Sequence, residues 1–391
     1  MQISVVGGSI GGLTAALVLR NLGHEVDVFE RSPHVLMQRG AGIGLLPETS
    51  RYLTDVANME IDDISISTSN IVHLARDNSV LHQTKHQYRF SSWNTVYRQL
   101  LSCWGTDRYH LNHEMTQWSN VNVSPISVTF ANGSSVESDL VVFADGVNSM
   151  ARAQLVPGSQ PRYSGYVAWR GMVPESEVSA SSRASLGDSI TYHVYANSHI
   201  LVYPIPGLDG EVEPGKRLIN FVWYRNYASG GDKEDLLTDI NGVQREVSLP
   251  PGAVSPHHVA EMKAHAEARL PAAIAEIVTK TEEPFLQVVF DLAIPQMNFG
   301  HACLLGDSAN LARPHAAAGT AKAADDAWAL GHALSTSSSV SEALEKYNES
   351  QTAIGHQLIN RTENIGRRSQ FDGTWVPGDR DLIFGLKAPG A

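Results

Sequence analysis

Residues 3–30 read ISVVGGSIGGLTAALVLRNLGHEVDVFE, and this stretch decides the fold. The β-branched run Ile3–Val6 predicts a strand, and the apolar positions that begin at Leu13 predict a helix that ends near Gly23. A second strand is expected over Val26–Phe29. Glycines between strand and helix allow the close approach of a pyrophosphate, which the free N–H groups of the helix N-terminus bind. The stretch therefore predicts a β-α-β unit that binds a dinucleotide.

An acidic residue supports this reading of the glycine-rich turn. Glu30 follows the second strand eighteen residues after Gly12, close to the roughly 20-residue spacing at which a carboxylate binds a ribose hydroxyl. Ser9 stands where the usual fingerprint has its second glycine. A turn that only packs helix on strand is the alternative, and Glu30 argues against it. The motif fits NAD and FAD equally.

Composition and charge argue against several classes of protein. The 391 residues are 42% hydrophobic and 18% charged, enough for a large core in one extended domain or two closely packed ones. A net charge of −12 without clustered Lys and Arg argues against a nucleic-acid-binding surface. Two cysteines, Cys103 and Cys303, cannot form a disulfide framework, and no apolar run reaches the roughly 18 residues of a membrane span. With no signal-peptide pattern at the start, we expect a cytoplasmic protein that acts on small molecules.

Two further motifs lie downstream. The apolar segment 139–143 predicts a strand, and Asp145-Gly146 beyond it begins a D-G-x-x-S-x-x-R pattern that ends at Arg152. Arg98 begins an R-x-x-L pattern in a helical stretch. Together with the first motif, in this order, they resemble the flavin-dependent aromatic hydroxylases, the group that contains p-hydroxybenzoate and salicylate hydroxylases. Phe143 departs from that family, which usually has glycine there.

A further motif of the same family follows an expected strand near the C-terminal quarter of the chain. Gly306-Asp307 resembles the family's second FAD motif, in which the aspartate contacts ribityl hydroxyls, and Pro314 matches the proline before its flavin loop. A helix expected from about Thr320 would point its N-terminus at the flavin, where its dipole stabilises negative charge. The family's G-G-Q-G-x-N run is replaced by Ala316–Ala321, whose small residues still permit close approach. Alone, this stretch would be an Ala-rich core helix.

The resemblance implies an α/β fold. It has a Rossmann-like FAD-binding domain, an interleaved mixed-sheet substrate domain and a C-terminal helix. The expected parts are 1–160 for the first FAD-binding segment, 161–290 mainly for the substrate sheet, and 291–391 for the second FAD-binding segment with the helix and tail. The residues expected to bind FAD are Gly7, Ser9, Gly12, Glu30, Arg31, Gly42, Arg98, Asp145, Gly146, Asp307, Pro314, Ala317, Ala318, Gly319 and Thr320.

Local patterns predict the remaining elements. Asn132-Gly133 predicts a hairpin, and helical spacing from Leu344 to Leu358 predicts the C-terminal helix. The Ser-rich stretches 179–185 and 335–341 are expected to be loops, and the Gly/Pro-rich end, 371–391, is expected to wrap around the body or to fray. Runs of β-branched and aromatic residues predict the strands of the substrate sheet over 191–195, 200–205 and 218–224.

Within the family, segments 163–171 and 201–207 most resemble the dihydroxypyridine hydroxylase branch. The resemblance implies that NADH or NADPH is a transient reductant of FAD and that a C4a-hydroperoxyflavin, formed with O2, hydroxylates a hydroxylated aromatic or pyridine ring, with or without decarboxylation. The expected partners are this small aromatic substrate, O2 and a second copy of the chain in a homodimer; no metal is expected. An FAD-dependent epoxidase, a reductase or dehydrogenase of the same fold, and a non-catalytic flavin-binding protein are the alternatives.

The candidate catalytic side chains are His315, Tyr203 and His193. His315 follows the flavin-loop proline, from where it would reach the ring or assist its deprotonation; Tyr203 and His193 lie on neighbouring expected strands. The structural alternatives are a surface imidazole or a helix-start hydrogen bond for His315 and a core tyrosine with a satisfied hydroxyl for Tyr203. Trp169-Arg170 and Tyr224-Arg225 are further candidates for binding an aromatic anion, with arginine–carboxylate pairing as the alternative.

Overall fold

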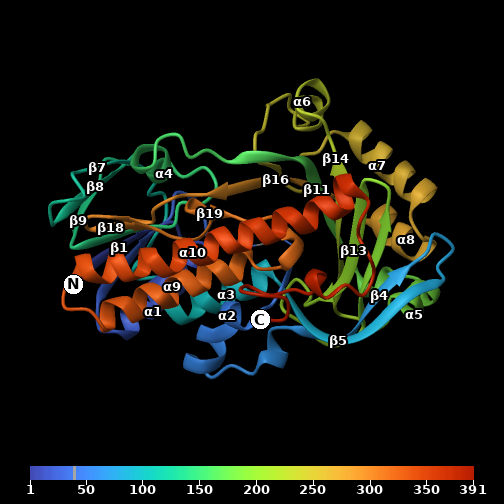
Figure 1. The fold of residues 1–391 in the computed structure, drawn as a ribbon, viewed down its shortest axis with the longest axis horizontal. Coiled ribbons are helices and arrows are strands. Elements are labelled where there is room, and N and C mark those ends of the chain that lie inside the picture. Colours follow the sequence, from blue (N-terminus) through green and yellow to red (C-terminus); the bar gives the residue numbers. More distant parts are fainter. Residues whose placement is uncertain (38–40) are drawn as a thin grey trace.

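A computed structural model of the chain describes residues 1–37 and 41–391 (Figure 1). The predicted β-α-β unit is present as strand β1 (Gln2–Val6), helix α1 (Ile10–Asn21) and strand β2 (Glu25–Phe29). Strands β1 and β2 are parallel, so the chain crosses over through α1 between them. The glycine-rich turn therefore lies at the carboxyl end of β1, the position where sheets of this type bind their ligands.

Strand β1 is central in a six-stranded sheet, which explains why motifs far apart in sequence meet. The strand order is β17-β18-β10-β1-β2-β6, and β10 pairs in parallel with both β1 and β18. The carboxyl ends of β1, β10 and β18 consequently share one edge, where the chain continues into the glycine-rich turn, the Asp145 corner and the Gly306 corner. The other strands of this sheet are β6 (Tyr109–His110), β10 (Leu140–Phe143), β17 (Asn298–Phe299) and β18 (Ala302–Leu304).

Helices and a small sheet pack around the six-stranded sheet. Helix α1 packs against α3 (Trp93–Trp104) and α9 (Gly319–Ser335), and the long helix α10 (Val340–Arg367) runs along α9 (Figure 1). The predicted hairpin at Asn132-Gly133 is confirmed, because β8 and β9 pair in antiparallel fashion on either side of it. It belongs to a three-stranded sheet of β7 (Met115–Trp118), β8 (Ile126–Phe130) and β9 (Ser135–Ser138).

A ten-stranded mixed sheet forms the second layer, and it includes the three strands expected for the substrate sheet. Its order is β15-β16-β11-β14-β13-β12-β4-β5-β3, with β19 paired to β16. Three of its strands come from 42–92, a stretch that lies inside the first FAD-binding segment expected from the sequence. The strands are β3 (Gly42–Gly44), β4 (Ile66–Leu74), β5 (Val80–Ser92), β11 (Arg162–Pro174), β12 (Ser189–Tyr195), β13 (Ser198–Ile205), β14 (Leu218–Asn226), β15 (Ser248–Leu249), β16 (Phe285–Ala293) and β19 (Asn310–Leu311).

The two faces of the ten-stranded sheet bury different sets of side chains. Trp169 and Trp223 belong to a core that includes residues of helices α7 and α8, whereas Tyr203 and Tyr224 belong to a separate core on the other face. The alternation of side chains along a strand produces this division. The helices on the first face are α5 (Ala180–Leu186), α6 (Gly231–Leu236), α7 (Pro256–Arg269) and α8 (Ala272–Lys280). Figure 1 shows α6 at the top, α7 and α8 at the right and α5 at the lower right.

One of the two Ser-rich stretches is helical, which corrects the expectation of a loop over 179–185. Ser179 caps α5 by accepting a hydrogen bond from the amide of Ser182. The hydroxyls of Ser179 and Ser182 both donate to the carboxylate of Glu276 on α8. Serine is a poor residue inside a helix but a good N-cap, and the tertiary contact with Glu276 stabilises this short helix. The second stretch contains the turn between α9 and α10, as expected.

The C-terminal tail wraps around the body, the first of the two outcomes expected for it. Phe384 and Leu386 are 5% and 1% exposed. Arg361 on α10 donates hydrogen bonds to the carbonyls of Ile383 and Gly385 and thereby fixes the tail to the helix. Leu386 packs in a small cluster with Leu358 of α10 and alanines of the 316–321 stretch. Residues 384–386 of the tail are therefore part of the folded core.

Short helical elements complete the fold. No helix among residues 1–37 and 41–391 is long and apolar enough to cross a membrane. Cys103 and Cys303 are free thiols. The short helices and turns are α2 (Pro47–Arg51), α4 (Met150–Leu155), the π-helical turns Tyr52–Val56 and Arg368–Asp372, and the 3₁₀ turns Ile61–Asp63, Glu175–Glu177, Gly306–Ser308, Pro314–Ala316 and Arg380–Leu382.

Replacing a buried leucine of the tail tests whether the tail contributes to stability. We expect Leu386→Ala to lower the free energy of unfolding by about 2–5 kcal/mol, because the side chain leaves a cavity in a packed cluster. Urea denaturation measures this change. The matched control is Leu208→Ala, whose side chain is 64% exposed and whose loss should change the stability by less than about 0.5 kcal/mol. Equal effects of the two substitutions would mean that the tail frays in solution.

Candidate active site

A cavity of about 380 Å³ lies between the carboxyl edge of the six-stranded sheet and one face of the ten-stranded sheet. Both sheets contribute to its wall, so it connects the FAD motifs with the expected substrate sheet. The described lining residues near the FAD motifs are Ser9, Ile10, Gly11, Gly12, Ala144, Gly146, Leu305, Gly306, Asp307, Pro314, Ala317, Ala318, Gly319, Thr320 and Ala323. The others are Gly42, Ile43, Gly44, Phe90, Trp93, Arg170, Leu201, Tyr203, Val222, Tyr224, Gln287, Leu311, Ala312 and Phe384.

Glycines in the first turn leave no room for side chains. A Cβ on Gly12 would lie 1.9 Å from the carbonyl oxygen of Gly7, and a Cβ on Gly7 would lie 2.2 Å from that of Ala144. Gly7 also has a φ of +110°, which glycine adopts without strain. The tight turn exposes the backbone at the N-terminus of α1 to the cavity, and residues 317–320 do the same at the N-terminus of α9. Two helix N-termini therefore present free amides and partial positive charge to one cavity.

Glu30 fixes the glycine-rich turn. One carboxylate oxygen accepts a hydrogen bond from the Gly8 amide at 2.9 Å, and the other accepts from the Ser32 amide at 2.9 Å. The side chain is buried and lies just beyond the described wall of the cavity. Its position at the end of β2, beside the turn, is the one from which the family's acidic residue would bind a ribose hydroxyl.

The D-G-x-x-S-x-x-R pattern forms an internal network. Asp145 accepts hydrogen bonds from the Ser149 hydroxyl at 2.6 Å and from the Ala151 amide at 3.2 Å. Arg152, which is 2% exposed, donates to the carbonyls of Val147 and Ser308. The pattern therefore holds the corner after β10 against the corner after β18. Gly146 lines the cavity, while Asp145 shapes the loop that carries it.

Asp307 lines the cavity, close to other charges. Burial within the protein raises its pKa to about 6; the Asp326 carboxylate adds to this rise, and Arg152 opposes it. Asp326 is fully buried, accepts a hydrogen bond from the Gly306 amide at 2.9 Å and forms an ion pair with Lys322. The pair thus positions the Gly306-Asp307 corner. An ionised Asp307 would accept hydrogen bonds from the polyol of FAD.

The wall formed by the ten-stranded sheet is mostly apolar and aromatic. Arg170 is the one cation among the lining residues that the structure describes, and it donates to the Gly42 carbonyl at 3.3 Å. Burial raises the pKa of Tyr203 to about 12 and raises that of Tyr224, although Arg170 opposes both shifts. Both phenols are therefore neutral hydrogen-bond donors near pH 7. Together with Gln287 they offer polar contacts to a flat ring held among Phe90, Leu201 and Val222.

His315 lies behind this wall in a buried polar network. Arg313 donates a hydrogen bond to the Tyr166 hydroxyl oxygen, and that hydroxyl lies 2.7 Å from Nε2 of His315. The His315 ring also contacts Tyr224, with a centroid separation of 4.7 Å. Burial lowers its pKa far below the ordinary value, with further contributions from His199 and Arg313. His315 is therefore a neutral imidazole that supports a cavity-lining tyrosine.

Three other predicted residues lie outside the described cavity wall. His193 is buried on β12, where its Nδ1 lies 2.9 Å from the carbonyl oxygen of Leu74. Arg98 projects from α3 toward the 208–209 loop, where Asp209 lies 3.8 Å away. Arg31 is exposed beyond β2. The structure brings Tyr203 to the cavity and leaves these three side chains away from it.

Two positioning residues escaped the sequence analysis. Asn220 on β14 accepts a hydrogen bond from the Gly42 amide at 3.0 Å, so it fixes the start of β3 to the centre of the substrate sheet. Asp326 fixes the Gly306 corner through the contact given above. A lysine and an aspartate four residues apart in an alanine-rich helix, as in Lys322 and Asp326, are consistent with an ion pair on one helix face. The contact of Asn220 has no comparable signal, because its partner is 178 residues away.

The residues of this cavity fit FAD. The glycine-rich turn forms a cradle that any Cβ would fill, as the 1.9 Å approach at Gly12 demonstrates. Two helix N-termini suit the pyrophosphate and the electron-rich edge of a flavin. Asp307 supplies the acceptor that ribityl hydroxyls need. The small residues of the 317–320 stretch leave space for a flat ring against the backbone.

Comparisons with known proteins agree with this geometry. A family model described as an NAD(P)-binding Rossmann-like domain matches residues 5–37, and one described as FAD binding domain-like matches residues 163–291. The chain is 35% identical over 386 residues to 2,6-dihydroxypyridine 3-monooxygenase of Paenarthrobacter nicotinovorans, with 98% of this chain and 96% of that protein covered.

Solved structures give the same result. The structure of 2,6-dihydroxypyridine-3-hydroxylase from Arthrobacter nicotinovorans matches with a TM-score of 0.93 and 34% identity, covering 99% of this chain and 97% of that one. Klebsiella pneumoniae HpxO complexed with FAD and uric acid matches with a TM-score of 0.78 at 20% identity, covering 98% of this chain and 90% of that one. The second match supports the fold alone, and the first also supports the family.

Acidification tests the role of Asp307 in FAD binding. Because the ionised carboxylate is the better acceptor, FAD affinity should be highest above pH 6 and should fall by up to about tenfold per pH unit as the pH drops through the Asp307 pKa of about 6. Asp307→Asn should weaken FAD binding roughly tenfold at pH 8, about 1.5 kcal/mol, and flatten the pH dependence. Flavin fluorescence titration measures both. Asp107→Asn, at an exposed site, is the control; a pH profile unchanged in Asp307→Asn would assign the carboxylate no role.

The buried pair Lys322–Asp326 permits a second test. Asp326→Asn leaves the ammonium of Lys322 buried without its anion, so we expect it to lower the free energy of unfolding by about 3–5 kcal/mol. The double substitution Lys322→Met with Asp326→Leu should recover most of this stability but not the FAD affinity, because a leucine side chain offers the Gly306 amide no acceptor. Thermal unfolding and flavin titration separate the two effects. Full recovery of FAD affinity in the double variant would show that Asp326 does not position the corner.

Proposed function

The chain belongs to the FAD-dependent aromatic monooxygenases, and within this family we propose that it hydroxylates a six-membered aromatic or pyridine ring that carries an ionisable hydroxyl group. The proposal covers decarboxylative hydroxylation as well, where a carboxylate occupies the attacked carbon. The relative that is 35% identical is named for a dihydroxypyridine, which makes hydroxylated pyridines the first substrates to test.

The observation that carries the proposal is the placement of Arg170 and two neutral phenols on one cavity wall. Attack on an electrophilic oxygen requires an electron-rich ring, and ionisation of a ring hydroxyl supplies that electron density. A guanidinium beside Tyr203 and Tyr224 stabilises the resulting oxyanion by charge and by hydrogen bonds from neutral hydroxyls. Aromatic and branched side chains nearby exclude water, which favours oxygen transfer over loss of peroxide.

FAD supplies the redox chemistry when it is bound: it accepts electrons from NAD(P)H and activates dioxygen. We assign its binding to the two helix N-termini, the Glu30 and Asp307 carboxylates and the small residues of the 317–320 stretch. NADH or NADPH is proposed to bind transiently. Within residues 1–37 and 41–391, the six-stranded sheet contains one glycine-rich β-α-β unit, and FAD occupies it in this proposal.

The roles of the three candidate catalytic residues differ in this proposal. Tyr203 is the substrate contact, because its side chain lines the cavity. His315 acts as a positioning residue through Tyr224, whose ring it contacts. His193 anchors β12 to the end of β4 through its contact with the Leu74 carbonyl. In this proposal the polar side chains of the cavity wall, among them Arg170 and Tyr203, assist removal of the proton from the substrate.

We also propose where the enzyme works and how its chains assemble. We propose that the enzyme works in the cytoplasm, where its two free cysteines stay reduced. A homodimer is the proposed assembly. Light scattering of the purified protein would distinguish it from a monomer or a tetramer.

Substrate-dependent turnover tests the proposal. Hydroxypyridines, hydroxybenzoates and alkylated phenols should accelerate NAD(P)H oxidation, with matching oxygen uptake and a product that gains one oxygen atom or exchanges a carboxylate for a hydroxyl. Arg170→Met should weaken binding of the best substrate by roughly 10–100-fold, since hydrogen bonds to a charged group contribute about 1.5–3 kcal/mol. The matched control is Arg225→Met. Arg225 lies on β14 directly after Tyr224 but forms an ion pair with Glu261 outside the cavity.

Three outcomes would contradict the proposal. Oxygenation of an alkene without turnover of any aromatic would indicate an epoxidase. Reduction of an acceptor without oxygen uptake would indicate a reductase or dehydrogenase. Equal effects of Arg170→Met and Arg225→Met on substrate affinity would remove the assigned oxyanion contact.

A further inference from the structure

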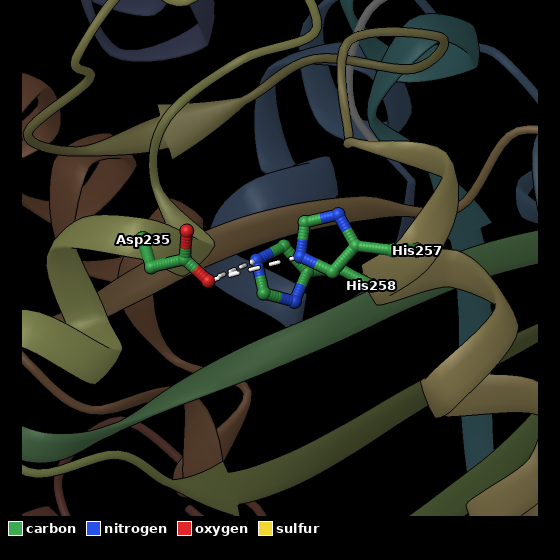
Figure 2. Close-up of side chains that lie close together, drawn as sticks. All are labelled: Asp235, His257 and His258. Carbon is green, nitrogen blue, oxygen red and sulfur yellow. Dashed lines mark ion pairs between the residues drawn. The ribbon is translucent and has the colours of Figure 1, made fainter.

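Two histidines and an aspartate converge on the helix-covered face of the ten-stranded sheet, away from the FAD cavity. Asp235 lies near the end of α6, and His257 and His258 lie in the first turn of α7. Figure 2 shows the carboxylate approaching from one side and both imidazoles from the other. We propose that these three side chains bind a divalent transition metal ion, with Zn²⁺ the best-matched ion.

The distances between the ligand atoms approach those of a metal's coordination shell. Nε2 of His258 lies 3.2 Å from Oδ2 of Asp235, and Nε2 of His257 lies 3.7 Å from the same oxygen. One ligand atom from each of the three residues lies within 4.8 Å of the other two. In a tetrahedral zinc site with bonds of about 2.0–2.1 Å, neighbouring ligand atoms are separated by roughly 3.4 Å. An ion therefore fits among these atoms with only small side-chain movements.

The second observation is a buried nitrogen without a hydrogen bond. The His258 side chain is 8% exposed, and its Nε2 has no hydrogen-bond partner among the described residues. The distance to Asp235 is short, but the geometry is not that of a hydrogen bond. A buried polar atom in this situation costs free energy unless a ligand satisfies it. The imidazole faces the side on which Asp235 lies, where a shared metal ion would bind.

A contact with Ser255 fixes the orientation of the His257 ring. Its Nδ1 lies 2.7 Å from the Ser255 hydroxyl, which leaves Nε2 to face Asp235. Metal-binding histidines usually make such a contact with the second ring nitrogen, because it sets the tautomer and the direction of the ring. Ser255 precedes α7 but does not cap it with its side chain. Its hydroxyl is therefore available for this supporting role.

The donor set and its location define the kind of site. Two imidazoles and one carboxylate suit Zn²⁺ better than Mg²⁺ or Ca²⁺, which prefer oxygen ligands. Water would complete the coordination, since Asp235 and His257 are 66% and 64% exposed. Leu236, next to Asp235, and Met262 of α7 pack in the core opposite Tyr203 and Tyr224. The metal would thus link α6 to α7 and close the segment between them, without contact to the FAD cavity.

Zinc titration of the FAD-bound enzyme tests the site. The tag-free protein is treated with EDTA, dialysed and titrated with ZnCl₂ in a calorimeter. We expect one zinc ion per chain and a thermal midpoint that rises with zinc. Asp235→Asn and His257→Gln, both at exposed positions, should each weaken binding more than tenfold. Ser255→Ala should weaken it by roughly tenfold, the effect typical of a supporting contact. His332→Gln, at another exposed histidine, is the matched control and should bind like the parent.

The outcomes separate a metal site from a simple ion pair. A protonated histidine beside Asp235 would also explain the short distances, and the enzyme would then bind no zinc in this titration. Zinc binding that is equal in the parent and in the Asp235→Asn and His257→Gln variants would likewise overturn the proposal. Flavin absorbance and circular dichroism identical to the parent show that a variant is folded. Because both substituted side chains are exposed, loss of zinc binding in folded variants is the result that supports it.

Discussion

The shape of the cavity depends on the hydrogen bonds that the buried guanidinium of Arg152 donates. The guanidinium donates to carbonyls on two loops, Val147 after β10 and Ser308 after β18, and the second of these contacts spans 156 residues of sequence. The parallel strands bring the ends of these loops to one edge of the sheet, but strand pairing alone does not set the gap between them. A charge-assisted hydrogen bond to each loop sets it. The Asp145 network and the Lys322–Asp326 pair then fix each corner from its own side.

The ten-stranded sheet separates two kinds of chemistry by its two faces. One face packs against helices with large apolar side chains such as Trp169 and Trp223, and it also carries the cluster of Asp235 with two histidines. The other face presents Tyr203, Tyr224 and Arg170 to the cavity. Because side chains alternate along a strand, neighbours such as Tyr224 and Arg225 have opposite environments. Substrate specificity and structural reinforcement can therefore change independently.

Much of the FAD site could be predicted because its motifs are local. Gly12, Gly146, Asp307 and the 317–320 stretch lie on the cavity wall, as a binding role requires. The helical Ser179–Ser182 stretch could not be predicted, since its stability comes from Glu276, which lies 97 residues from Ser179. Asn220 was missed for the same reason, because a contact across 178 residues leaves no trace in spacing.

The sequence by itself determined the nucleotide-binding unit, three strands of the substrate segment and the family, because glycine spacing, β-branched runs and short motifs act through neighbouring residues. Only the tertiary structure decided that Arg170 rather than Arg225 faces the cavity, and that His315 supports Tyr224 from behind. It also decided that Asp235 meets His257 and His258. The reason is that the alternation of side chains along a strand predicts which residues share a face of the sheet. Which of the two faces packs against helices, and which is left to bind a ligand, depends on the tertiary structure.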